Sequence, residues 1–344
     1  MRKIQWASLL LAGSALFTLQ AHADSTPGST TLGGKMYVDF TDLTQDTNGS
    51  STNAQGYGLD VKRFYISVNH IFDDTWSASF TTDITYDKNS GFESPLVKTA
   101  YVQAKVNDAA TFQLGSANMP WIPFDEDIYG YRFVENTLID RLHLGNSADW
   151  GVHFLGHSDG NVVNYNFAMV NGGGYKNPSR SKSEDFEGRV AFIPVDGLII
   201  AVGGYTGHLG QDLEQTPANN TATRQDALIA YNTKAATLAV EYFHADNFSP
   251  ALVTGTSTDS ASGYSVYGDV GLGDSGAKFF ARYDNVDPSK DLDPSKKDKY
   301  YNLGISFPAN KDITWAIAYK HEDLSDNVTT TTTKEIGVWA QVKF

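Results

Sequence analysis

The densest group of chemically active side chains lies in segment 118–148. Its charged members are Asp125, Glu126, Asp127, Arg132, Glu135, Asp140 and Arg141. Five acids and two arginines this close together could orient ions and polar solutes by their electric field. The same segment carries Trp121, Ile122, Phe124 and Ile128, whose apolar area favours burial. We therefore expect the segment to fold inward against the rest of the protein. The alternatives are that it caps a rim or meets a neighbouring subunit.

Motifs for making and breaking bonds are missing from the sequence. There is no Gly-x-Ser-x-Gly elbow, no His-Glu-x-x-His pair and no glycine-rich loop placed to hold phosphate. His153 and His157 share one phase of a predicted strand, but two imidazoles fit a polar wall better than a metal site. We predict no catalytic residues, no metal and no cofactor, and therefore no enzyme.

The first residues predict export. Arg2 and Lys3 precede a short apolar run, and Ala21-His-Ala23 has the small-x-small pattern of a signal-peptidase site. We expect residues 1–23 to be a cleaved signal peptide and 24–344 to form a single domain. Its 321 residues (344 − 23) carry a net charge of −16, because the formal charge of −14 loses two cations. This acidity argues against a nucleic-acid partner, and the absence of cysteine fits a bacterial envelope protein.

Alternation of apolar and polar residues recurs along the whole remaining chain. Period-2 alternation is typical of strands with one apolar and one polar face. It predicts sixteen strands, at 32–41, 57–71, 76–87, 96–106, 111–117, 149–157, 162–171, 185–193, 198–207, 224–232, 237–245, 262–272, 277–286, 299–307, 312–321 and 334–344.

The connections between these strands alternate between short and long. Short connections such as Ser158-Asp-Gly-Asn161 are followed by longer polar loops, of which 118–148 is the longest. This order predicts antiparallel up-and-down hairpins, with the tight turns at one end and the long loops at the other. Sixteen such strands of about ten residues match a transmembrane β-barrel, which hydrocarbon forces to close so that every backbone group is paired.

The apolar phase of the strands is suited to face lipid. It is free of charge in 162–171, 299–307 and 312–321, while exceptions such as Lys98 and His244 fall near the long-loop ends, where an interface tolerates them. The final stretch, Lys334-Glu-Ile-Gly-Val-Trp-Ala-Gln-Val-Lys-Phe344, alternates in the same way. We expect it to pair with the first strand and close the barrel.

These patterns resemble a known family. Phe72-Asp-Asp-Thr-Trp-Ser-Ala-Ser-Phe80, Lys98-Thr-Ala-Tyr-Val102 and the stretch from Gly115 to Phe124 resemble the Gram-negative outer-membrane porins. The N-terminal half is similar to the phosphate-selective porin group. The resemblance implies sixteen strands, homotrimers in outer-membrane lipid and a third loop that forms the constriction. Phosphate selectivity in that group depends on a basic lining, from which the acids of segment 118–148 depart.

The polar phase of the predicted strands carries charges of both signs. Its bases are Lys35, Arg63, Lys105, Arg189, Lys278, Arg282, Lys320 and Lys343. Its acids are Asp39, Asp83, Asp87, Glu187, Glu241, Asp269, Asp284 and Glu335. We expect Arg63, Lys105, Arg189 and Arg282 to face Asp125, Glu126 and Asp127 across the lumen. Eight bases against eight acids predict a transverse field and no strong anion preference.

The sequence thus favours a passive channel. We expect a water-filled, weakly selective pore for small hydrophilic solutes and ions, with a phosphate- or anion-selective porin as the alternative. An outer-membrane barrel enzyme or an adhesin is the alternative from another class.

Overall fold

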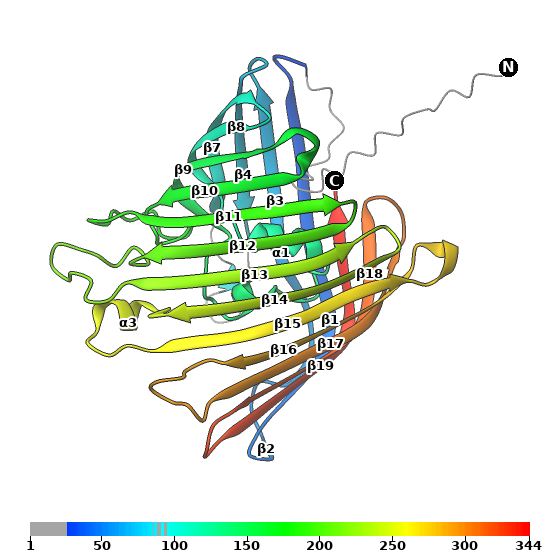
Figure 1. Cartoon of the computed structure of the whole chain (residues 1–344). Coiled ribbons are helices and arrows are strands. Elements are labelled where there is room, and N and C mark those ends of the chain that lie inside the picture. The colour runs from blue at the N-terminus through cyan, green and yellow to red at the C-terminus, as the bar shows by residue number, and fades with distance from the viewer. Residues whose placement is uncertain (1–25, 85, 88–90, 93–94) are drawn as a thin grey trace.

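The fold was analysed in a computed structural model, which describes residues 26–84, 86–87, 91–92 and 95–344. Within these residues a single closed antiparallel sheet dominates the protein (Figure 1). The predicted signal peptide, 1–23, lies outside them. In the described part of the chain, no helix is long and apolar enough to cross a membrane.

Sixteen of the described strands form the wall of the barrel, and each pairs with its neighbours along the chain. They are β1 (Thr30–Thr47), β3 (Gly56–Ile71), β4 (Trp76–Asp83), β7 (Leu96–Asn107), β8 (Ala110–Asn118), β9 (Ala148–His157), β10 (Val163–Val170), β11 (Asp185–Val195), β12 (Leu198–Gly207), β13 (Ala222–Asn232), β14 (Ala236–Asp246), β15 (Ser260–Gly271), β16 (Lys278–Asp287), β17 (Lys297–Pro308), β18 (Ile313–Ser325) and β19 (Thr330–Lys343). The sixteen-stranded fold predicted from the sequence is confirmed.

A few short elements lie outside the wall. Two-residue β2 extends the hairpin after β1, and β5 pairs with β6 beyond β4. The predicted strand 76–87 is therefore too long, since β4 ends at Asp83. The elements are β2 (Ser50–Ser51), β5 (Tyr86–Asp87), β6 (Gly91–Phe92), α1 (Ile122–Tyr129), α2 (Leu138–Arg141), α3 (Pro250–Thr254) and two 3₁₀ turns, Asp159–Asn161 and Gly273–Ser275.

The barrel closes through its first and last strands. β19 pairs antiparallel with β1, from Lys35 opposite Lys343 to Thr47 opposite Thr331. Beyond this ladder, Gly34 and Phe344 exchange backbone hydrogen bonds of 2.8 and 3.1 Å. The expected pairing of the C-terminal strand is thus present, and it leaves the sheet without an open edge.

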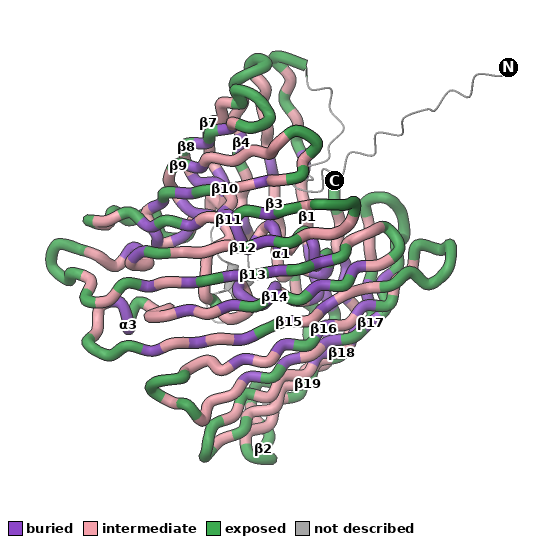
Figure 2. Tube along the Cα trace, viewed as in Figure 1, coloured by how far each residue is buried: buried purple, intermediate pink, exposed green. Residues whose placement is uncertain are grey.

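The two phases of each strand face different surroundings. In β18, Trp315 and Ile317 are exposed, whereas Ala316 and Ala318 are buried. Buried and exposed residues alternate in this way along most strands (Figure 2). The exposed phase is mainly apolar and the buried phase holds the polar side chains, which is the inverse of a soluble sandwich and suits a barrel in lipid.

Two of the register shifts on the N-terminal side of the wall place an extra lysine in a strand. Lys62 is the extra residue where β3 pairs with β1, and Lys98 is the extra residue where β7 pairs with β4. A bulge re-aims the side chains of its strand. Lys62 points to the inner face, where its Nζ lies 3.4 Å from Asp39, and the Nζ of Lys98 lies 4.9 Å from the ring centre of Tyr65.

Candidate functional site

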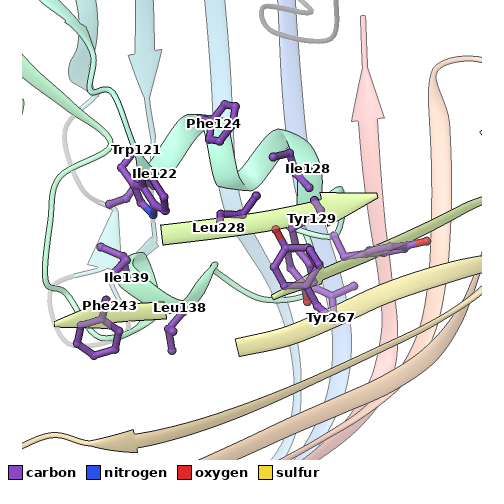
Figure 3. Packing of buried hydrophobic residues seen from close by; sticks show 14 of the residues in the cluster. Trp121, Ile122, Phe124, Ile128, Tyr129, Leu138, Ile139, Leu228, Phe243 and Tyr267 are labelled. Atoms are coloured by element: carbon purple, nitrogen blue, oxygen red, sulfur yellow. The ribbon is translucent and has the colours of Figure 1, made fainter. Parts of the chain in front are cut away.

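The connection between β8 and β9 is packed against the inner phase of the wall. It contains α1 and α2, and it buries Trp121, Ile122, Leu138 and Ile139 completely. These side chains join Leu228, Phe243 and Tyr267 from β13, β14 and β15 in one apolar cluster (Figure 3). Since burial of each large apolar side chain contributes about 1.5–3 kcal/mol, the connection is a stable part of the core.

The start of the connection is held by buried polar groups of the wall. The backbone N–H of Trp121 donates to Glu187 on β11, and its indole Nε1–H donates to Glu241 on β14, both at 2.9 Å. Arg189 Nε–H donates to the carbonyl of Pro120 at 2.9 Å. The other end is held by Arg224, which donates to the carbonyl of Leu144 at 2.8 Å. These four contacts fix both ends of the connection to β11, β13 and β14.

Gly203 on β12 provides the space for the Trp121 ring. A Cβ at Gly203 would lie 2.5 Å from that ring, whereas a Cβ at the next residue, Gly204, meets only a backbone oxygen at 3.2 Å. We expect Gly203→Ala to displace the buried indole and to lower the free energy of unfolding by about 1–3 kcal/mol. Denaturant unfolding of the lipid-reconstituted protein measures this. Gly204→Ala is the matched control on the opposite face, and equal losses in both variants would contradict the packing described.

The end of α2 is held by a network of buried charges. Arg141 lies 3.1 Å from Asp284, 3.1 Å from Asp298 and 2.6 Å from Glu322, on β16, β17 and β18. Burial disfavours the charged guanidinium, but Asp284 and Asp298 outweigh it and raise the pKa of Arg141 above its ordinary value. Arg141 therefore links three neighbouring strands to the connection as a permanent cation.

A second buried charge acts beside it. Glu135 lies 2.9 Å from Lys320 on β18, which also pairs with Glu335 on β19. Burial disfavours the charged carboxylate, yet Lys320 and Lys62 outweigh it and hold the pKa of Glu135 below its ordinary value. Arg141 and Glu135 are thus attachment points of the connection.

Four other predicted residues of the connection keep contact with solvent. Arg132 lies 2.5 Å from Glu126 and 3.1 Å from Asp140, so these charges neutralise one another in part. Asp127 is exposed and has no ion pair among the described residues. Displacement of water by the surrounding protein raises the pKa of Asp127 to about 6, against the opposing effect of Lys35.

The wall opposite Asp127 carries cations. Lys35 on β1 is within electrostatic range of Asp127, Glu126, Lys98 and Lys343. In the described part of the chain neither Lys35 nor Lys98 forms an ion pair, and each instead lies near an aromatic ring, that of Tyr37 or Tyr65. The unpaired Lys35 and Asp127 therefore lie within electrostatic range of each other, and Lys98 lies within range of Lys35 and Glu126.

Apart from Asp83, Lys98 and Lys105, the inner phase of β4, β7 and β8 carries mainly neutral polar residues. Gln103 donates to Ser77 at 3.4 Å, and Gln113 donates to Gln103 at 2.8 Å. Ser67 and Thr81 form a further hydrogen bond of 2.9 Å. These side chains bond to one another across the strands, and the core cluster of the connection contains none of them.

The structure does not pair the predicted wall bases with the predicted loop acids. Arg63 pairs with Asp83 at 2.8 Å. Arg189 donates to Pro120 and Asn164, and Arg282 pairs with Asp284 at 2.7 Å. Lys105 is half-exposed and pairs with Asp108 in the tight turn after β7. Within the part of the chain that the structure describes, it forms no hydrogen bond or ion pair with the connection. None of the four forms an ion pair with Asp125, Glu126 or Asp127 among the described residues.

Sequence reasoning missed Lys62, Lys98 and Arg224 as inner-face cations. Lys98 was expected on the lipid phase near a loop, and that placement is wrong because a bulge turns it inward. The sequence contained a signal for Lys62. Adjacent residues of a regular strand point to opposite faces, so one of the two neighbouring cations, Lys62 and Arg63, would face lipid unless a bulge intervened. Arg224 and Asp226 share the buried phase of β13 and are paired at 2.9 Å.

The described residues contain no group of histidine and acidic side chains that could hold a metal ion. The carboxylates of the inner face are instead close to arginine, lysine or tyrosine donors. Among them, Glu187 and Asp226 both contact Arg224, at 2.7 and 2.9 Å.

Comparisons with known proteins show which solved structures share this fold. No protein-family model matches the chain, and no curated protein matches it. Among solved structures, it is similar to the outer membrane channel DcaP of Acinetobacter baumannii, with a TM-score of 0.66 and 11% identity over 92% of this chain and 98% of that one.

Two further solved structures match over a similar length. The anion-selective porin from Comamonas acidovorans has a TM-score of 0.63 and 15% identity over 92% of this chain and all of the other. The trimer form of OmpT, an outer membrane protein of Vibrio cholerae, has a TM-score of 0.62 and 15% identity over 93% of this chain and all of the other. The chain therefore has the closed sixteen-stranded barrel fold found in bacterial outer-membrane porins.

Proposed function

We propose that this protein is an outer-membrane porin, a water-filled channel for passive diffusion of small hydrophilic solutes and ions. The observation that carries the proposal is the β8–β9 connection, which contacts inner-phase residues of strands from β11 to β18 and also reaches β1 and β3 through Tyr37 and Lys62. A segment that touches so much of a closed wall lies within the lumen and narrows it.

The path for solutes runs along the side of the lumen that the connection leaves open. There the polar inner faces of β4, β7 and β8 meet the solvent-facing residues Glu126, Asp127 and Arg132. No bond is made or broken, and the pore needs no cofactor. Narrowing by this segment sets the size limit, and the charges along the gap set the preference between ions.

Removal of residues 121–135 tests the constriction. We expect the deletion to raise single-channel conductance several-fold in planar bilayers, because the segment that narrows the lumen is gone. Deletion of the exposed residues 213–217, in the loop after β12, is the control and leaves conductance near that of the intact protein. Unchanged conductance after deletion of 121–135 would refute the constriction, and a protein without conductance steps would refute the channel.

A second observation favours an anion-preferring channel over an unselective one. Lys35 and Lys98 are unpaired cations of the described wall, whereas Glu126 is paired with Arg132. The census of eight bases and eight acids in the sequence left out Lys98, which adds an unpaired cation to the inner face. Reversal potentials in asymmetric KCl, repeated with potassium phosphate, separate a general anion preference from a phosphate preference.

We also propose outer-membrane localisation and a homotrimer. The apolar exposed phase of the strands supports the first, and the trimeric Vibrio cholerae structure of the same fold supports the second. Sucrose-gradient fractionation of cell envelopes and cross-linking in detergent test these two points. Recovery in the inner-membrane fraction, or monomers only, would contradict them.

A further inference from the structure

The strongest unexplained feature is a pair of buried carboxyl groups between α1 and the wall. Asp125 of α1 and Glu241 of β14 are both completely buried. One oxygen of each is satisfied, since Asp125 Oδ1 accepts from the Tyr267 hydroxyl at 2.5 Å and Glu241 Oε1 accepts from Trp121 Nε1–H at 2.9 Å. The other oxygen of each, Asp125 Oδ2 and Glu241 Oε2, has no donor at hydrogen-bonding distance in the described structure, and the Thr137 hydroxyl near Asp125 is also without a partner.

The two carboxyl groups are neighbours around Trp121, which donates to Glu241 through its indole N–H and accepts from the backbone N–H of Asp125 at 3.0 Å. Each carboxyl also acts electrostatically on the other. Two ionised carboxylates so close would repel and would leave two buried acceptors without a donor. A single proton removes both problems, because the O–H of one carboxyl then donates to the other. From the buried contacts of Asp125 and Glu241, we infer that they share one proton and form a pH-sensitive latch that holds α1 against the wall.

Charged neighbours do not replace this proton. The nearby arginines, Arg224 and Arg282, are paired with carboxylates of their own strands, Asp226 and Asp284. The groups that face the pair come from five elements and are Glu187 of β11, Arg224 and Asp226 of β13, Tyr267 of β15, Arg282 of β16, and Thr137 and Trp121 of the connection. Two further acids among them add to the repulsion that ionisation of the pair would cause.

The direction of the pH effect follows from the buried position of Asp125. Burial raises the pKa of Asp125 to about 6, so its proton favours the packed state of the connection. That contribution weakens as the pH rises through about 6, and the hydrogen bond is lost once neither carboxyl holds a proton. Release of α1 then loosens the connection inside the lumen. The inference rests on the proposed channel function, which it extends by a means of regulation.

The experiment compares the intact protein with Glu241→Gln in planar bilayers from about pH 5 to about pH 9. In the variant, the amide oxygen still accepts from Trp121 while the amide N–H donates to Asp125 at every pH. We expect current fluctuations and subconductance events of the intact protein to increase several-fold at alkaline pH, and this increase to be lost in Glu241→Gln. Glu214→Gln, which changes an exposed carboxyl in the loop after β12, is the control that retains the increase.

Infrared spectroscopy of the reconstituted protein gives a readout that does not depend on conductance. A component of the carbonyl band from this buried protonated carboxyl is expected at about pH 5 in the intact protein and is expected to be lost in Glu241→Gln. Absence of the band in the intact protein overturns the inference even if the channel conducts. An equal response of the conductance to pH in both proteins also overturns the inference. So does a midpoint of the pH-dependent change in current that shifts with cation concentration, because a bound cation would then take the place of the proton. Absence of conductance steps at every pH refutes the channel but leaves the infrared test standing.

Discussion

Replacement of both Lys35 and Lys98 by glutamate is expected to reverse the ion preference of the channel, from anions to cations. Both side chains lie on the inner face without an ion pair in the described structure, within electrostatic range of Glu126 of the connection. A narrow pore with protein walls focuses the field of such charges, which extends over a Debye length of about 8 Å at physiological salt. The double change therefore acts directly on permeating ions.

We expect the ratio of anion to cation permeability to fall at least about tenfold, which corresponds to about 1.4 kcal/mol. Reversal potential in asymmetric KCl measures this ratio. Lys105→Glu is the matched control, because Lys105 is also a lysine of β7 but pairs with Asp108 in the exposed turn. An equal shift in Lys105→Glu would show that the overall charge of the barrel sets the preference. An unchanged reversal potential in the double variant would show that the two lysines do not act on permeating ions.

The largest effect on stability is expected from Arg141→Met. Arg141 is nearly buried and contacts Asp284, Asp298 and Glu322. Methionine keeps much of the side-chain volume but leaves the buried Asp298 carboxylate without its cation, while Asp284 keeps only Arg282. Loss of one partner of a buried ion pair costs about 3–5 kcal/mol, so we expect a loss of that size in the free energy of unfolding.

Denaturant unfolding of the protein refolded into lipid vesicles measures the effect of Arg141→Met. Lys182→Met is the control, because Lys182 and Glu214 form an exposed pair, for which a loss of about 0–1 kcal/mol is expected. Arg141→Lys tests geometry, since it restores the charge without the planar guanidinium that reaches three carboxylates, and a partial recovery is expected. A loss in Arg141→Met no larger than that in the control would show that Arg141 does not hold the connection.

Much of the wall could be predicted because lipid imposes a simple rule on each strand. Apolar residues at alternate positions, as in Trp315 and Ile317 of β18, indicate the phase of a strand without knowledge of any other strand. The order of short and long connections then indicates antiparallel neighbours. Closure between β1 and β19 followed because an open edge in hydrocarbon would leave backbone groups unpaired.

The inner charges were harder to predict because their partners are distant in sequence. Lys98 was misplaced by strict alternation, which a bulge in β7 breaks. Arg189 and Arg282 were correctly assigned to the inner phase of their strands, but their partners, Pro120 and Asp284, depend on how the connection packs. Alternation gives the face of a residue and says nothing about what that face touches.

The sequence by itself determined the barrel, its sixteen strands, their order and the face that each presents to lipid, because these depend on local periodicity and on connection length. Only the tertiary structure decided which charges of segment 118–148 attach it to the wall and which remain open to solvent. Asp125, Glu135 and Arg141 belong to the first group, and Glu126, Asp127 and Arg132 to the second. The physical reason is that a charged residue in a loop follows no periodic rule, and its role depends on partners brought near it by closure of the whole sheet.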